Sequence, residues 1–147
     1  MDLDQNDFEK IIEFLASENF FVDKNFSPKS IGDGQSNPTF LIRDKGNNFK
    51  VLRTQPIGNL ARGAHRVDRE FSVIKALFNK GFECPQPFAL CNNSELIGRM
   101  FYVMDFEEGD INFDPFLPDE SFEDKQKIYK SLAEVLGRLH SYDIDEL

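Results

Sequence analysis

The sequence predicts an α+β fold in which helices flank an antiparallel β-sheet of about five strands. Three stretches carry apolar residues at helical spacing, and short β-favouring runs lie between them. A connector rich in turn residues joins the first two of these runs, which favours a hairpin. The resulting order of helix, strands, helix, strands, helix is that of an α+β domain built on an antiparallel sheet.

The first element is expected to be a helix over residues 6–17. Asn6 can cap this helix, with Glu9 three residues later as in a capping box. The apolar residues that repeat at helical spacing are Phe8, Ile11, Ile12 and Leu15. Residues 19–29 break this period and Pro28 closes the break. The helix is therefore expected to end before them.

A hairpin and a second helix are expected next. Residues 39–42 and 49–52 are β-favouring runs on either side of the turn-rich residues 43–48, which predicts an antiparallel hairpin. A helix should then run over residues 65–79, with Gly81 ending it. Its buried face is expected to consist of Val67, Phe71, Ile74 and Phe78.

Two further strands and a last helix complete the predicted fold. Residues 88–91 form a short β-favouring run after two prolines. Residues 100–106 make the strongest strand in the chain, and because they are apolar on both faces we expect this strand inside the sheet. The last helix should cover residues 121–141. Its apolar face is Phe122, Ile128, Leu132, Val135, Leu136 and Leu139.

Composition limits the classes of function. A chain of 147 residues with 40% hydrophobic residues, including 16 Phe, can bury a real core. The formal net charge of −9 argues against a nucleic-acid partner and against an anionic membrane, because both require a basic face. A polyanionic small ligand could bind only where donors are concentrated locally.

The cysteines and the first residues point to the cytoplasm. Cys84 and Cys91 are the two cysteines, and without a secretion signal such a pair is expected to stay as free thiols. Residues 1–7 are acidic and lack the apolar run of a signal peptide. No apolar run approaches the length of a membrane span. We therefore expect a cytoplasmic protein.

A glycine segment, residues 31–40, offers the first candidate site. Gly32 and Gly34 let the backbone approach a ligand closely, and the polar residues Gln35, Ser36 and Asn37 follow them. Placed between two strands, such a segment covers nucleotide phosphates in kinases. It lacks the third glycine of a dinucleotide fingerprint and the Gly-Lys-Ser/Thr of a P-loop. The alternative is an ordinary hairpin turn.

A cation and a carboxylate form the second candidate. Arg53 ends the strand after the predicted hairpin, where kinase-like folds place a cation that holds the α/β-phosphates. Glu70, on the following helix, is the carboxylate that could pair with it. The alternative is that both side chains are simply solvated.

A hinge is the third candidate. Residues 101–109 form an apolar strand that runs into an acidic linker ended by a glycine, with Met104, Asp105 and Phe106 at the junction. Such a junction suits a hinge whose backbone groups meet an adenine edge. The same residues would also suit a central core strand with a tight exit.

These three pieces, in this order, resemble the aminoglycoside-phosphotransferase-like kinases. The residues that carry the resemblance are Gly-Asp-Gly-Gln-Ser-Asn-Pro-Thr-Phe, Val-Leu-Arg, His-Arg-Val-Asp-Arg-Glu-Phe and Tyr-Val-Met-Asp-Phe-Glu-Glu-Gly. The similarity covers about residues 31–147 and is closest to the branch associated with acyl-CoA dehydrogenases. It implies three segments: a lead-in with the first helix (1–30), a nucleotide-binding amino lobe with its hinge (31–109), and a linker with the first helix of a carboxy lobe (110–147).

The resemblance also implies a ligand and residue roles. It implies ATP with Mg²⁺, a small hydroxylated substrate and γ-phosphate transfer to that hydroxyl. The residues implied to contact the nucleotide are Gly32, Gly34, Gln35, Ser36 and Asn37 at the phosphates, Arg53 reaching them, Glu70 orienting Arg53, and Met104, Asp105 and Phe106 around the adenine. The substrate could be an aminoglycoside, another amino alcohol or a hydroxyacyl compound.

Other parts of a phosphotransferase are not found in the sequence. Transfer needs a His-Gly-Asp loop and further metal ligands, whereas His65 precedes a helix and His140 is wrongly spaced from Asp143. No catalytic or metal-binding residue is therefore assigned, and this chain alone is expected to be inactive. A non-catalytic kinase-like docking module that self-associates through an exposed lobe interface is the alternative, and an unrelated α+β binding domain is more distant.

Overall fold

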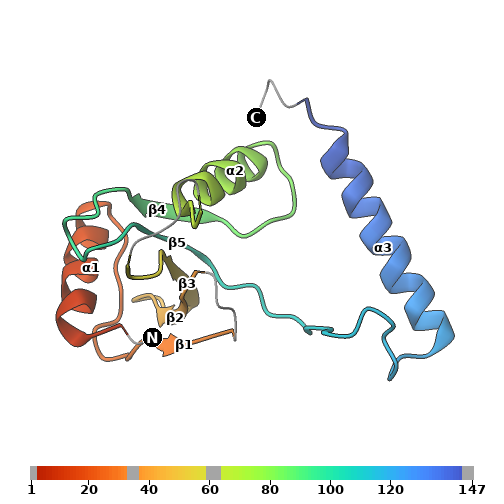
Figure 1. The fold of residues 1–147 in the computed structure, drawn as a ribbon, viewed down its shortest axis with the longest axis horizontal. Helices are drawn as coiled ribbons and strands as arrows, with labels where there is room; N and C mark the ends of the chain where they lie inside the picture. Colours follow the sequence, from red (N-terminus) through yellow and green to blue (C-terminus); the bar gives the residue numbers. More distant parts are fainter. Residues whose placement is uncertain (1–2, 33–36, 59–63, 144–147) are drawn as a thin grey trace. The chain divides into compact units, whose positions relative to one another are not determined.

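A computed structural model describes residues 3–32, 37–58 and 64–143 (Figure 1). Within them lie three helices and five strands: α1 (Gln5–Ser17), β1 (Lys29–Ser30), β2 (Thr39–Arg43), β3 (Phe49–Thr54), α2 (Val67–Asn79), β4 (Pro87–Cys91), β5 (Phe101–Asp105) and α3 (Phe122–His140). The predicted α+β fold with an antiparallel sheet is confirmed. β1 was not predicted, because two residues beside a proline carry no periodic signal.

The sheet has the strand order β1-β2-β3-β5-β4, with antiparallel pairing throughout. The hairpin of β2 and β3 is confirmed, and its turn is closed by Asp44, whose Oδ1 accepts from the backbone N of Asn48 at 2.8 Å. β5 lies between β3 and β4, as expected for the strand that is apolar on both faces. Residues on its two faces can therefore serve different purposes.

Helix α1 covers one face of the sheet. Its predicted apolar residues pack with strand residues in one core, which comprises Phe8, Ile11, Ile12, Leu15, Val22, Phe40, Ile42, Leu52, Ala89, Cys91, Ile97, Phe101 and Val103. The prediction of Asn6 as the cap is wrong. The helix begins one residue earlier and is capped by Asp4, whose Oδ1 accepts from the backbone N of Asp7 at 2.7 Å.

Helix α2 lies on the opposite face. Its core joins Val67 and Phe71 to Tyr102, the neighbour in sequence of Val103 on the α1 side. The predicted burial of Phe78 is wrong, since its side chain is 37% exposed and Leu77 is buried instead. The chain reverses directly after α2, with Gly81 at a φ of 78° and Phe82 N donating to Leu77 O at 3.0 Å. The last turn of α2 therefore buries the side chain of Leu77 and leaves that of Phe78 exposed.

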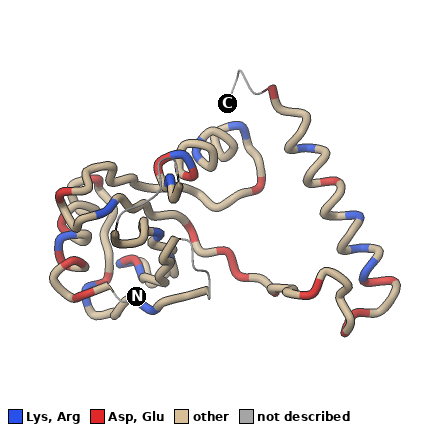
Figure 2. The backbone as a smooth tube through the Cα atoms, viewed as in Figure 1, with Lys and Arg blue, Asp and Glu red and all other residues tan. Residues whose placement is uncertain are grey.

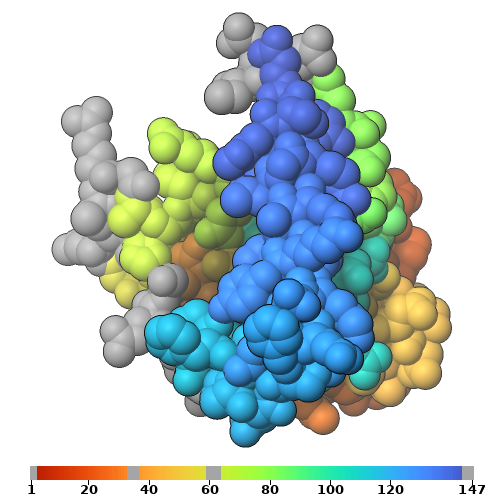
Figure 3. All heavy atoms as spheres, turned by 90° about the vertical axis from the view of Figure 1, so that its right-hand side faces the viewer, coloured from red at the N-terminus to blue at the C-terminus, as the bar shows by residue number. Residues whose placement is uncertain are grey.

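The chain divides into two compact units, Met1–Glu107 and Glu108–Leu147. The second unit begins with a segment that carries several acidic residues, drawn red in Figure 2. Ser121 then caps α3 by accepting from the backbone N of Asp124 at 3.1 Å. No residue of α3 is buried. Figure 3 draws the atoms of α3 in blue, facing the viewer.

Candidate functional site

The register of the sheet sets a row of polar side chains on the α2 face. Thr39 of β2 is the partner of Arg53 of β3, and Arg53 is in turn the partner of Tyr102 of β5. Directly opposed residues of antiparallel strands point to the same face. The hydroxyl, the guanidinium and the phenol thus lie side by side, and Arg53 Nη1 donates to Thr39 Oγ1 at 3.2 Å.

Glu70 reaches this row from α2. Its Oε2 accepts from Arg53 Nε at 2.7 Å and from the hydroxyl of Tyr102 at 3.2 Å, while its Oε1 accepts from Asn37 Nδ2 at 2.7 Å. The helical spacing that buries Val67 and Phe71 keeps Glu70 at the interface between helix and sheet. The predicted partners Arg53 and Glu70 thus form an ion pair in which donors from three separate segments orient the carboxylate.

Tyr102 keeps its proton in this site. Burial raises the pKa of its hydroxyl above the usual range, and the negative charge of Glu70 raises that pKa further. The side chain is 1% exposed. The phenol is therefore a fixed, neutral donor at physiological pH, and it helps to hold the carboxylate in one orientation.

Asn37 belongs to the same network. Its side chain is buried, and besides donating to Glu70 it meets His65, whose Nδ1 lies 3.1 Å from Asn37 Oδ1. Sequence reasoning assigned Asn37 to the phosphates and left His65, Thr39 and Tyr102 out of the site. The alternation of β5 could have suggested Tyr102, because it lies two residues from Met104 on the same face. Nothing local in the sequence points to His65.

The glycine segment is described only at its two ends. Gly32 has a φ of 86°, a left-handed conformation that favours glycine, and an added Cβ would meet no atom within 4 Å. Gly34, Gln35 and Ser36 lie outside the described residues. The segment joins β1 to β2, which pair with each other, so its placement between two strands is as expected.

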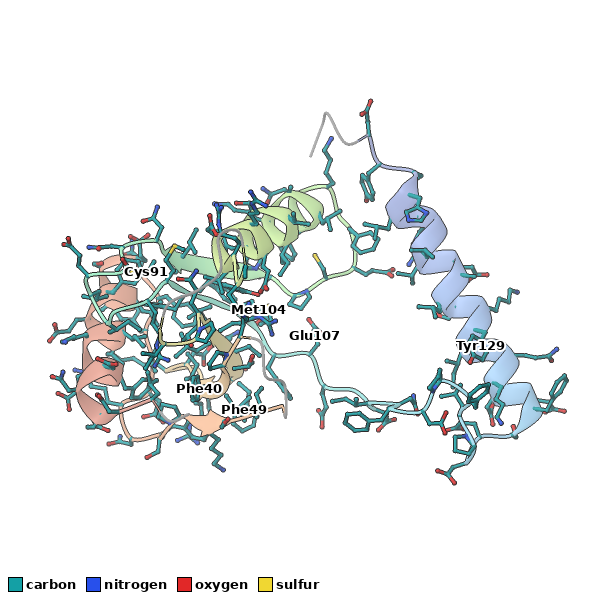
Figure 4. All side chains as sticks on the ribbon, in the orientation of Figure 1. Phe40, Phe49, Cys91, Met104, Glu107 and Tyr129 are labelled. Carbon is teal, nitrogen blue, oxygen red and sulfur yellow. The ribbon has the colours of Figure 1, made fainter. Side chains whose placement is uncertain are left out.

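The residues predicted to surround the adenine do not all point to the same face of the sheet. Met104 (labelled in Figure 4) is the partner of Val51 on the α2 face, next to the row that holds Arg53. Phe106 is 37% exposed and contacts Phe49, with ring centroids 6.3 Å apart. The carboxylate of Asp105 has another partner, because the alternation of β5 directs it to the α1 face.

On that face Lys50 holds Asp105. Lys50 Nζ lies 2.5 Å from Asp105 Oδ1 and 3.6 Å from Asp44 Oδ2, and its side chain is 11% exposed. The backbone N of Asp105 donates to Gln86 O at 2.9 Å. Neither the carboxylate nor the N–H of Asp105 is thus free for a ligand on the α2 face. Within Asp105, a ligand contact on that face would therefore fall to the backbone carbonyl.

Other kinds of site find little support in the described residues. No group of three or more His, Cys, Asp and Glu residues that could hold a metal ion occurs among them. Both cysteines are free, and burial raises the pKa of each thiol. None of the described helices is both long and apolar enough to cross a membrane.

Comparison with curated proteins finds relatives that are much longer than this chain. Acyl-CoA dehydrogenase family member 11 of Rattus norvegicus is 48% identical over 114 residues, which are 78% of this chain and 14% of that protein. The probable acyl-CoA dehydrogenase IBR3 of Arabidopsis thaliana is 44% identical over 126 residues, which are 83% of this chain and 15% of that protein. The predicted similarity to the branch associated with acyl-CoA dehydrogenases is confirmed.

A solved structure and a family model agree on the fold. A crystal structure described as a candidate aminoglycoside phosphotransferase, from Ralstonia eutropha, matches with a TM-score of 0.72 and 28% identity. The match covers 94% of this chain and 39% of that one, so the sheet and helices correspond to the kinase-like amino lobe. The model of the phosphotransferase enzyme family matches residues 27–147. The chain carries the Arg53–Glu70 pair on the α2 face of its sheet. Because the family model matches most of its length, this chain belongs to the phosphotransferase enzyme family.

Proposed function

We propose that this chain is the nucleotide-binding lobe of an ATP-dependent phosphotransferase that acts on a hydroxyl of a small molecule. The observation that carries the proposal is the Arg53–Glu70 ion pair on the α2 face of the sheet, with 2.7 Å between Nε and Oε2. Arg53 is the register partner of Thr39, a residue of the glycine segment. A guanidinium held in this way presents its remaining N–H groups in a fixed direction, which suits phosphate oxygens.

The exposure of the pair supports a ligand-binding role. The side chains of Arg53 and Glu70 are 31% and 34% exposed, so solvent screens their attraction and the pair contributes little to stability, on the order of 1 kcal/mol or less. Besides the bond between Arg53 and Glu70, three further side chains hydrogen-bond to one or other of them: Asn37, Thr39 and Tyr102. Such a fixed orientation serves binding better than it serves folding.

The remaining roles follow the geometry of the sheet. Gly32, with its left-handed φ, together with Gly34, Gln35 and Ser36, would bring backbone N–H groups to the phosphates. Met104 and Phe106 would frame the adenine. For Asp105 the proposed contribution is its backbone carbonyl, because its carboxylate pairs with Lys50.

Transfer requires groups that the described residues do not provide. The described residues include no group of three or more His, Cys, Asp and Glu residues that could hold a metal ion. On the ground that the sequence carries no His-Gly-Asp loop, we propose that the base and the main metal ligands come from a carboxy lobe. The chain spans about a seventh of the length of the curated relatives it matches. Names among the similar proteins mention both an aminoglycoside and acyl-CoA, so an amino alcohol and a hydroxyacyl compound are both proposed as substrate classes.

Calorimetry of this chain with Mg·ATP tests the proposal. We expect weak saturable binding, protection of residues 34–37 from hydrogen exchange on addition of Mg·ATP, and no phosphate transfer. Arg53→Ala should weaken binding about tenfold, since it removes charge-assisted hydrogen bonds to phosphate. Arg69→Ala is the matched control, because Arg69 is exposed, carries the same charge and lies beside Glu70 in the helix.

The outcomes separate the proposal from its rival. Absence of heat together with absence of protection would refute nucleotide binding, and a stable dimer under those conditions would favour the docking module. Equal losses for Arg53→Ala and Arg69→Ala would reduce the role of Arg53 to net charge. Turnover by this chain would overturn the assignment of the base to residues outside it.

A further inference from the structure

The side chain of His65 stands at the end of a chain of hydrogen bonds that leads to Glu70. His65 Nδ1 lies 3.1 Å from Asn37 Oδ1, and Asn37 Nδ2 lies 2.7 Å from Glu70 Oε1. His65 lies two residues before Val67, the first residue of α2, whereas Asn37 lies in the glycine segment. The two contacts therefore link Asn37, in the described part of that segment, to Glu70 of α2 and to His65.

The donor and acceptor roles in these two hydrogen bonds determine the tautomer of His65. An ionised carboxylate only accepts hydrogen bonds, so the amide atom of Asn37 that faces Glu70 must be its NH₂ group. The other amide atom, which faces the imidazole, is then the carbonyl oxygen and also only accepts. The Nδ1 atom of His65 must therefore carry a proton in every protonation state that keeps the contact.

The backbone of His65 is held in an unfavourable conformation. Its φ is 55°, in the left-handed region, which costs a residue with a Cβ roughly 1–2 kcal/mol. Two donors hold its carbonyl in place: Gln55 Nε2 at 2.9 Å and the backbone N of Val67 at 3.0 Å. The amide of Gln55 is itself fixed, because its Oε1 accepts from the backbone N of Met100 at 3.2 Å. Residues that adjoin β3 and β5 thus support the strained residue that directs the imidazole towards Asn37.

We propose that His65, in its Nδ1–H tautomer, and Asn37 are positioning residues that orient Glu70 and thereby set the direction of Arg53. Neither side chain is then a direct phosphate ligand. The amide of Asn37 is used at both ends, by His65 and by Glu70. The effect on nucleotide affinity rests on the proposed function, whereas the tautomer and the hydrogen bonds do not.

Nuclear magnetic resonance of the unliganded chain tests the proposal without any nucleotide. A long-range ¹H–¹⁵N correlation of neutral His65 should show the protonated shift at Nδ1 and the lone-pair shift at Nε2. The side-chain NH₂ of Asn37 should exchange slowly with solvent, since it is buried and bonded to a carboxylate. A proton on Nε2 with a bare Nδ1 would overturn the proposal whether or not the chain binds Mg·ATP.

Substitutions at His65 separate the donor from the shape of the backbone. His65→Asn places an N–H near the Nδ1 position and tolerates the left-handed φ, so the dissociation constant for Mg·ATP should stay within about twofold of the original. His65→Gly relieves the strain but removes the donor, so that constant should rise about threefold to tenfold, the equivalent of one lost hydrogen bond. His65→Asp, nearly isosteric with the Asn variant, places an acceptor against an acceptor and should weaken binding at least as much as His65→Gly.

The pattern across the three variants decides the matter. Thermal unfolding should show that His65→Gly is fully folded at the temperature of the binding measurement, which excludes simple unfolding as the cause of weaker binding. The Nε–H resonance of Arg53 should shift in the Gly and Asp variants and stay in place in the Asn variant. Equal behaviour of the Asn and Gly variants in affinity and in that resonance would overturn the proposal. If the original chain binds no Mg·ATP, the proposed function fails and the two resonance measurements still decide the roles of His65 and Asn37.

Discussion

The two faces of the sheet use neighbouring residues for different ends. On the α1 face Leu52 and Val103 are fully buried in an apolar core. On the α2 face their neighbours in sequence, Arg53 and Tyr102, meet a carboxylate from a helix. Apolar burial needs only closeness, whereas the polar face needs directed donors and acceptors, each with a partner. We therefore expect the α1 face to contribute most of the stability, and the proposed ligand site lies on the α2 face.

The polar side chains on the α2 face are also more exposed to solvent than the apolar core on the α1 face. Arg53 and Glu70 remain about one third exposed, whereas Leu52 and Ile42 on the other face are 0% exposed. A site for an anionic ligand must be reachable, so a fully buried guanidinium would serve poorly. We expect substitutions on the α1 face to change stability and substitutions on the α2 face to change affinity.

The largest effect should come from Leu52→Ala. This change empties space in the α1-side core and should lower the free energy of unfolding by about 2–5 kcal/mol. The side chain points away from Arg53, so the dissociation constant of the folded fraction for Mg·ATP should change by about twofold at most. Urea denaturation and calorimetry below the transition measure the two quantities. A large loss of affinity in fully folded Leu52→Ala protein would remove the distinction between the faces.

Glu70→Gln should show the opposite pattern. It removes the charge that orients Arg53 but keeps the size of the side chain, so affinity for Mg·ATP should fall about threefold to tenfold. Because the pair is partly exposed, the free energy of unfolding should change by about 1 kcal/mol or less. Glu13→Gln, at an exposed position of α1, controls for net charge. Loss of stability without loss of affinity would assign Glu70 to the fold instead.

Tyr102→Phe sharpens the comparison at the boundary between the two uses. The change removes one donor to Glu70 and keeps the ring that packs against Phe71. The free energy of unfolding should fall by about 0.5–1.5 kcal/mol, with a smaller loss of affinity than in Glu70→Gln. Chemical denaturation of Tyr102→Phe beside the original chain measures it. An unchanged free energy of unfolding would mean that the phenol contributes nothing to holding the carboxylate.

The smallest effect concerns acid stability at the start of α2. Two hydrogen bonds from Arg66, chiefly, lower the pKa of Asp68 from 3.8 to about 2. A carboxyl whose pKa is lower in the folded state stabilises the fold above its unfolded pKa, and this stabilisation is lost as pH falls from about 4 to about 2. Asp68→Asn should therefore reduce the loss of stability across that window. An identical pH dependence for both proteins, measured by urea denaturation, would contradict this assignment.

Local patterns predicted most of the elements. Helical spacing identified α1, α2 and α3, and the turn-rich connector identified the hairpin of β2 and β3, because these signals depend on residues close in sequence. The errors lie where a signal was short or shared. β1 has two residues, and Asp4 and Asn6 are equally good caps, so nothing local chose between them. Phe78 was predicted to be buried, but the chain reverses directly after α2 and Leu77 is the buried residue instead.

The candidate site likewise contains one arrangement that the sequence predicted and one that it did not. The order of the segments indicated Arg53 and Glu70, which the structure places 2.7 Å apart. Assignment of Asp105 to the nucleotide face did not foresee that the pleat of β5 turns its carboxylate towards Lys50. The roles of all these residues at a nucleotide remain predictions.

The sequence by itself determined the fold class, the family resemblance and the cation–carboxylate pair, since each rests on residue types in a fixed order along the chain. Only the tertiary structure decided which side chains surround Glu70. Thr39, Arg53 and Tyr102 meet through strand register, and Asn37 and His65 meet across 28 positions of sequence. Long-range pairing leaves no periodic trace in the sequence, and the direction of a hydrogen bond depends on partners that only folding brings together.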